Sequence, residues 1–197
     1  MPTSIDIASN ALVMIGDEPI SSFDDPGAGA LVASAIYPNT YRSLLASHPW
    51  TFSLKEVFLS RLTQEPDDKT NYKYAFQLPP NLIRIWKVMS HSNYDNVGRL
   101  LYSNETELLC RYGYQVDEVD LPPHFVQALE YKLASDFAIS VTEDIQKAAY
   151  YEDKFLKQSS IARSIDSQGH PQVKVVDSPF VDVRASGKYT GFGGCYY

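Results

Sequence analysis

The spacing of apolar residues changes twice along this chain, and this change constrains the fold more than any single motif. Apolar side chains recur at helical spacing over 4–16 and 28–47, alternate with a period of two from Tyr72, and return to helical spacing after Pro123. A period near 3.6 builds an apolar face on a helix, whereas a period of two builds one on a strand. The predicted fold class is therefore α+β: a mainly helical bundle with a small antiparallel β region inserted before its last two helices.

The four predicted helices cover 4–16, 28–47, 123–141 and 143–165, and the last two are expected to form a hairpin. Thr3 or Ser4 can cap the first helix, because a side-chain oxygen accepts from free backbone N–H groups. Gly16 can end that helix, since glycine adopts the left-handed conformation. Thr142 is expected to cap the last helix. Pro38 is expected to kink the second helix because proline has no N–H to donate.

The apolar stripes of these helices define the expected core. The residues predicted to face inward are Ile7, Ala8, Ala11, Leu12 and Ile15 in the first helix, Tyr37, Tyr41, Leu44 and Leu45 in the second, Val126, Leu129, Leu133 and Phe137 in the third, and Ile145, Ala148, Ala149, Phe155, Leu156 and Ala162 in the fourth. Pro49 should end the second helix, and Trp50 should then cover the helix end or enter the core, where its indole N–H needs an acceptor. An exposed Trp50 would instead be an interface anchor.

The predicted β region covers about residues 72–116. Runs rich in β-branched and aromatic residues occupy 82–90, 98–102 and 106–114, with turn-forming Asn, Asp and Ser residues between them. We expect them to pair as an antiparallel meander, with one face on the helices and the other available to a neighbouring subunit. The segment 52–62 fits a helix or a strand, and its spacing does not decide between the two.

A chain of 197 residues is long enough for one domain, or one domain and an arm, to bury a core without disulfides or metals. We predict a domain over 1–169 and an extended C-terminal arm over 170–197. No apolar run approaches the roughly 20 residues that span a bilayer, and residues 1–6 lack the basic start of a signal peptide. The protein is therefore expected to be made and kept in a cytosol, without a membrane partner.

The predicted arm is rich in apolar and aromatic residues but has no internal core of its own. Its candidate partner-binding residues are Val175, Phe180, Val181, Val183, Tyr189, Phe192, Tyr196 and Tyr197. Disordered tails are ordinarily poor in such residues, so this composition indicates a segment that a partner orders, as an added strand or an embracing arm. A mobile tail with incidental apolar content is the alternative.

Motifs for catalysis, cofactors or metals are not found in the sequence. The chain has no P-loop, dinucleotide glycine fingerprint or Gly-x-Ser-x-Gly elbow. Its histidines lie far apart and lack the paired spacing of metal ligands: His48, His91, His124 and His170. Its cysteines, Cys110 and Cys195, suggest neither a disulfide framework nor a zinc site. We therefore predict no catalytic residue, no cofactor and no metal.

Charge narrows the possible partners. Adjacent acidic residues occur at Asp24-Asp25, Asp67-Asp68, Glu143-Asp144 and Glu152-Asp153. Such neighbours rarely converge on one site, and they suit caps, loops and solvated helix faces better than magnesium binding or acid–base catalysis. The net charge of −7 argues against a surface that grips nucleic acid, because that affinity comes largely from Lys and Arg.

Three stretches, taken in order, carry a family resemblance. They are 11–25 (ALVMIGDEPISSFDD), 44–50 (LLASHPW) and 74–80 (YAFQLPP). Over roughly residues 5–165 the chain resembles the head-to-tail adaptor of short-tailed bacteriophages, also called tail tubular protein A. It departs from that pattern at Pro38, within a helix that is unbroken in similar chains, and at Thr51-Phe52-Ser53, where Asn or Thr, Phe and Ala usually follow the Pro-Trp pair. Neither departure changes the expected fold class.

The resemblance implies a structural virion protein rather than an enzyme. Such an adaptor forms a ring between the portal protein and the tail nozzle protein (tail tubular protein B), as a dodecamer that matches the portal, and tail fibres are a further possible partner. Its C-terminal arm reaches onto the portal. DNA passes through the lumen without sequence-specific binding, and an acidic wall would let it slide. The location would be the head-tail junction of the virion, and the host cytoplasm during assembly.

Two alternatives stay open at this point. One is a head-completion or stopper protein of a long-tailed phage, which is also structural. The other is a small hydrolase whose scattered histidines and carboxylates converge only on folding. A deep pocket with a strongly coupled His and Asp would favour the hydrolase, whereas aromatic faces without a pocket would favour the adaptor. We also expect the isolated chain to be a monomer, because ordering the arm costs entropy that portal contact would offset.

Overall fold

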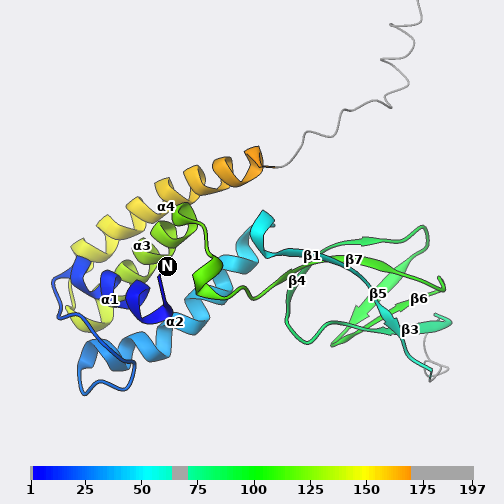
Figure 1. Cartoon of the computed structure of the whole chain (residues 1–197), viewed down its shortest axis with the longest axis horizontal. Helices are drawn as coiled ribbons and strands as arrows, with labels where there is room; N and C mark the ends of the chain where they lie inside the picture. The colour runs from blue at the N-terminus through cyan, green and yellow to red at the C-terminus, as the bar shows by residue number, and fades with distance from the viewer. Residues whose placement is uncertain (1, 64–70, 170–197) are drawn as a thin grey trace, which may run out of the picture.

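The computed structural model describes residues 2–63 and 71–169 of the chain. The helices gather at one end of the described molecule, and the strands that connect α2 to α3 form the other end (Figure 1). The helices are α1 (Ser4–Ile15), α2 (Ala28–Ser47), α3 (Pro123–Val141) and α4 (Ile145–Gln168). The strands are β1 (Leu54–Phe58), β2 (Ser60–Arg61), β3 (Tyr74–Gln77), β4 (Leu82–Met89), β5 (Tyr94–Val97), β6 (Leu100–Ser103) and β7 (Leu109–Tyr114). The α+β class with four helices is confirmed.

The start and end of α1 follow from its flanking residues. Thr3 caps the helix: its Oγ1 accepts from the backbone N–H of Asp6 at 3.2 Å, and the Asp6 carboxylate accepts from the Thr3 N–H at 2.8 Å. This reciprocal pair satisfies two N–H groups that the helix leaves free. Gly16, at φ 90°, ends the helix in the left-handed region. Both sequence signals at α1 are confirmed.

α2 covers the predicted residues and continues through Pro38. It ends before Pro49, and Trp50 then turns back into the helical core, where its side chain is completely buried. The indole Nε1 donates to the carbonyl of Leu44 at 3.0 Å, one of the acceptors left free at the end of α2. The expectation that Trp50 belongs to the core is confirmed, and the exposed-anchor alternative is wrong.

Asp144, not Thr142, caps α4. The Asp144 carboxylate accepts from the backbone N–H groups of Gln146 and Lys147 at 2.9 and 3.0 Å. The Thr142 hydroxyl instead donates to the Ala138 carbonyl at the end of α3, so it is already in use. α4 therefore begins two residues later than predicted and extends to Gln168.

The predicted inward face of α4 is only partly right. Ala148 and Ala162 are buried as expected, but Ile145 is 78% exposed, Leu156 is 59% exposed, and Ala149 is exposed as well. The buried residues of α4 are Ala148, Ser159, Ala162 and Asp166. These are mostly small side chains, which let α4 lie close against α3 (Figure 1). Packing against one neighbour selects a small-residue face and leaves larger apolar residues outside.

The β region is antiparallel, as predicted, but it is not a meander. It forms a sheet of order β1-β7-β4 and a second sheet of order β2-β3-β6-β5. The predicted strand 98–102 corresponds to β6, which pairs with β3 and β5, while β4 pairs with β7. Gly98, at φ 63°, closes the β5–β6 hairpin, which separates these strands from the β4–β7 pair.

The β region also begins earlier than the predicted residue 72. The ambiguous segment 52–62 forms a short 3-10 turn, Thr51–Ser53, followed by β1 and β2. β1 pairs with β7, a partner more than 50 residues away in sequence. Because this distant pairing stabilises an extended backbone, the segment forms strands rather than a helix. The β region therefore covers residues 54–114.

Each end of the molecule has its own hydrophobic cluster. The helical cluster joins α1, α2, α3 and α4 with Trp50, Val116 and Leu121, and the sheet cluster is smaller: Leu59, Phe76, Leu78, Val88, Leu101, Leu108, Cys110 and Tyr112. Tyr114 packs against both clusters. The Tyr41 hydroxyl donates to the Val116 carbonyl at 2.6 Å, and Arg84 of β4 donates to the Ala46 carbonyl at 2.9 Å. These contacts join the helical end to the strands.

Candidate interaction surfaces

The predicted portal-binding arm lies outside the described residues. This applies to each of its candidate residues: Val175, Phe180, Val181, Val183, Tyr189, Phe192, Tyr196 and Tyr197. The helices and strands of residues 2–63 and 71–169 carry exposed apolar surfaces of their own.

The first surface is the outer face of α4, defined by Ile145, Ala149 and Leu156. These residues share one side of the helix because they are four and then seven positions apart. All three are exposed. Burying a side chain of leucine or isoleucine size stabilises a contact by about 1.5–3 kcal/mol, so this face can contribute substantially to an interface.

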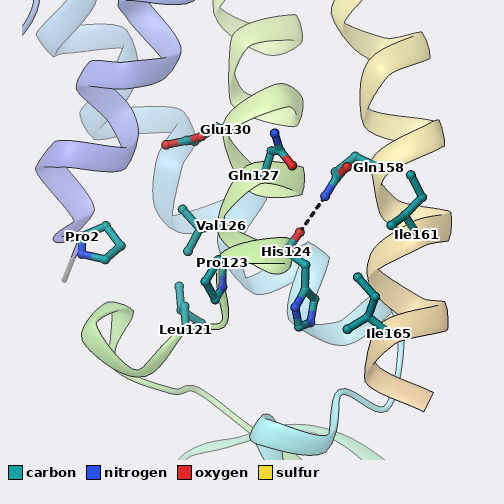
Figure 2. Close-up of a pocket in the computed structure, with 10 residues that line it drawn as sticks. All are labelled: Pro2, Leu121, Pro123, His124, Val126, Gln127, Glu130, Gln158, Ile161 and Ile165. Atoms are coloured by element: carbon teal, nitrogen blue, oxygen red, sulfur yellow. Dashed lines mark hydrogen bonds between the residues drawn. The ribbon is translucent and has the colours of Figure 1, made fainter. Parts of the chain in front are cut away.

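The second surface is a groove between α3 and α4, with a volume of about 660 Å³ (Figure 2). Its residues are Pro2, Leu121, Pro123, His124, Val126, Gln127, Glu130, Gln158, Ile161 and Ile165. Ile161 and Ile165 extend from α4 on one side, and Pro2, Leu121 and Val126 lie on the other side (Figure 2). Ile161 is 52% exposed. The groove is thus largely apolar and open to a further chain segment.

A few polar groups accompany the apolar walls of this groove. Gln158 of α4 donates to the His124 carbonyl at 3.3 Å, which ties the two helices together (Figure 2). Glu130 accepts from the Asn10 side chain at 2.8 Å, and burial raises the pKa of its carboxyl group, although that hydrogen bond opposes the rise. Such groups can orient a bound peptide, since recognition sites combine apolar walls with a few hydrogen-bonding side chains.

A second hollow, of about 480 Å³, lies among α2, α3 and α4. Lys132, one of its residues, pairs with Asp136 at 3.1 Å and with Glu152 at 2.9 Å. Burial acts to lower the pKa of Lys132, but the hydrogen bonds and charges of these carboxylates raise it above its ordinary value. The lysine therefore stays charged and serves to link α3 to α4.

The hydrolase alternative depends on a coupled His and Asp in a pocket. His48 Nε2 lies 3.8 Å from an Asp166 oxygen, but that carboxylate accepts the Thr51 hydroxyl at 2.6 Å and the Thr51 backbone N–H at 3.0 Å. Burial lowers the pKa of His48, despite the nearby Asp166. Neither His48 nor Asp166 is among the residues that form the two hollows. The pair ties the end of α4 to the turn after α2, and its geometry gives the hydrolase no support.

The strands expose a third surface. On β1, Phe58 is 65% exposed and Val57 is also exposed; on β5, Tyr94 and Val97 are exposed. β1 and β5 are outer strands of their sheets, so each has one edge without a strand partner in the described part of the chain. Exposed apolar side chains on an edge strand favour association with another chain.

Other chemical groups add little to these surfaces. The Cys110 thiol is buried, and burial raises its pKa to about 11, which disfavours the thiolate form that reacts. In residues 2–63 and 71–169, no cluster of three or more His, Cys, Asp or Glu side chains could hold a metal ion. None of the helices described here is both long and apolar enough to cross a bilayer.

Sequence reasoning did not identify the groove. Its α4 residues Ile161 and Ile165 carried a usable signal, because their spacing of four places them on one side of the helix. Leu121 and Pro123 precede and start α3, and only folding brings them opposite α4. No protein-family model matches the chain, and no curated protein is significantly similar to it.

Proposed function

We propose that this chain is a structural virion protein, a head-to-tail adaptor of a short-tailed bacteriophage. In this proposal, copies of the chain form a ring, a dodecamer in the virion, between the portal protein and the tail nozzle protein. The ring is part of the conduit for DNA ejection and has no enzymatic activity. The proposal starts from the family resemblance of three sequence stretches and is supported by surfaces that suit assembly.

The outer face of α4 is the observation that carries the proposal. α4 has 24 residues, yet only Ala148, Ser159, Ala162 and Asp166 among them are buried. Leu156 and Ile145 are apolar residues turned outward on a long helix at the edge of the bundle (Figure 1). Exposed apolar side chains that share one side of a helix offer a contact that a neighbouring subunit can cover.

The parts of the molecule divide naturally among the proposed partners. The α3–α4 hairpin would form the ring wall, with the outer face of α4 against the next copy. The exposed edges of β1 and β5 would face the nozzle protein, and tail fibres are a further candidate there. The arm 170–197 would hold the portal. The net charge of −7 suits a lumen through which DNA slides without specific binding.

The direct test is assembly with the portal. The purified chain would be mixed with a recombinant portal ring of its own phage, and the mixture imaged by cryo-electron microscopy beside the chain alone. We expect monomers alone and rings that cap the portal in the mixture. Free monomers beside bare portals would overturn the proposal, and a stable ring at micromolar concentration without portal would contradict the expected monomer.

A pair of variants tests the ring interface. Leu156→Asp places a charge on the outer face of α4 and should prevent ring formation, because an unpaired charge at an apolar interface is costly. Leu31→Asp is the matched control, since Leu31 is an exposed leucine on α2. Both variants should unfold in urea like the unchanged chain. If Leu156→Asp formed rings in normal yield, the outer face of α4 would not be part of the ring interface.

The arm is tested by deletion. A chain that ends before Pro171 should keep its circular dichroism spectrum and lose portal binding, because it retains every residue named in the helical and sheet clusters. Retained portal binding by the shortened chain would refute the role of the arm.

A further inference from the structure

We infer that the groove between α3 and α4 binds residues 171–176 of the same chain while the subunit is free. The occupant is the segment that directly follows α4, and it would return along α4 as an extended strand. This inference goes beyond the proposed function and does not depend on it, since no portal takes part in the contact.

The position of the groove makes this segment the nearest available chain. α4 ends at Gln168, and Ile165 and Ile161 of the groove lie within its last two turns. With a helical rise of about 1.5 Å per residue, Ile161 is roughly 10 Å along the axis from Gln168. Six extended residues reach about 20 Å, so a segment that reverses near Gly169 passes both isoleucines.

The segment has the side-chain pattern that the groove requires. Its sequence is Pro171-Gln172-Val173-Lys174-Val175-Val176. In an extended chain Val173 and Val175 project to the same side, where they can cover Ile165 and Ile161, while Lys174 projects away toward solvent. The amide nitrogens of Gln127 and Gln158 already donate to the Tyr131 hydroxyl and the His124 carbonyl, but their amide oxygens can accept from the N–H groups of an extended backbone.

Charge also favours this occupant. Residues 170–197 contain three basic side chains, Lys174, Arg184 and Lys188, and two acidic ones, whereas the whole chain has a net charge of −7. The remainder of the chain is therefore strongly acidic, and Glu130 is the acidic residue of the groove itself. The segment 171–176 carries Lys174 and no acidic side chain, so the acidic body does not repel it as it would repel a second copy of itself.

The contact should be weak and intramolecular. Two buried valines offset only part of the entropy lost by ordering six residues, so the segment can leave when a stronger partner binds it. The short connection to α4 gives the segment a high effective concentration, which favours its own groove over that of another copy. Val175 would thus be covered in the free subunit and become available during assembly.

The test is hydrogen exchange measured by mass spectrometry on the full chain without portal. The double variant Val173→Asp and Val175→Asp should exchange at least about twofold faster in the peptides that cover 121–130 and 158–168, because the groove opens. The double variant Val181→Asp and Val183→Asp is the matched control in the same arm and should leave these rates unchanged. Equal rates in the first variant and the unchanged chain would overturn the inference.

A second pair changes the groove instead of the segment. Ile161→Asp should free the segment and speed exchange in 171–176, whereas Leu156→Asp on the outer face of α4 should not. Protection that increases with protein concentration would identify a second copy as the occupant and overturn the intramolecular assignment. Since Ile161 is half exposed, its substitution leaves the helical core in place.

Discussion

The helical end and the β end of this molecule use their apolar residues differently. At the helical end, side chains from all four helices meet in one cluster around Trp50 and Phe125. At the β end, two sheets share a small cluster, and every residue of β5 is exposed. The helices therefore supply most of the buried apolar surface, while the strands keep faces and edges open. The comparison shows that one chain can build a closed core beside a surface with room for a partner.

α4 has both a side that is buried in the helical core and a side that is left exposed. Its inner residues Ala148 and Ala162 complete the helical core, and its outer residues Ile145 and Leu156 stay exposed like the side chains of β5. An apolar face that no other described element covers is available for assembly at little cost in folding stability. The contrast between buried and exposed apolar side chains therefore occurs between two sides of α4 as well as between the two ends of the molecule.

The largest expected loss of stability comes from a cavity in either hydrophobic cluster, and it tests whether the two clusters open separately. Phe125→Ala should lower the free energy of unfolding by about 3–5 kcal/mol, because it leaves a cavity among the rings of Tyr41, Trp50 and Phe52. Phe76→Ala makes the same change in the sheet cluster. Urea unfolding measures both costs. Hydrogen exchange should show faster opening of all the helices for Phe125→Ala, and of residues 54–114 alone for Phe76→Ala. Loosened helices in the Phe76 variant would show that the two ends open together.

A smaller effect is expected where the helical end meets the strands. Asp166→Ala removes the acceptor of the Thr51 hydroxyl and backbone N–H and should cost about 2 kcal/mol in urea unfolding, the usual range for hydrogen bonds to a buried charge. Asp153→Ala is the control, since Asp153 forms an exposed pair with Lys157 at 2.6 Å. Equal stability of the two variants would show that the Asp166 tie is dispensable.

The smallest effect concerns the Tyr41 hydroxyl and depends on pH. Tyr41→Phe removes the hydrogen bond to the Val116 carbonyl and should cost about 1 kcal/mol near neutral pH. Burial, together with the nearby Glu118 carboxylate, raises the pKa of Tyr41 above its ordinary value of about 10. Above that pH the unfolded chain releases this proton first, so the contribution of Tyr41 to stability is present below about pH 10 and is lost as pH rises further. Unfolding at about pH 7 and about pH 11 should therefore show a smaller difference at the higher pH, and an unchanged difference would contradict the raised pKa.

The sequence by itself determined the local elements of this protein. Helical spacing, the Thr3 cap, Gly16 and Pro49 depend on residues within one or two turns, so they identify α1 and α2 without knowledge of the rest. The stripe of α3 is equally legible, because its predicted residues Val126, Leu129, Leu133 and Phe137 are all buried, although Ile139 of the same helix is 59% exposed. The fold class followed from these local signals.

Tertiary structure decided what depends on distant partners. The pairing of β1 with β7 made a strand of an ambiguous segment, and the pairing of β6 with β3 replaced the expected meander. Likewise, close packing on α3 selected the small side of α4 and left Leu156 outside. A chain's periodicity states which residues share a face, but which face is covered depends on the neighbour that packs there, and that neighbour is fixed only when the whole chain folds.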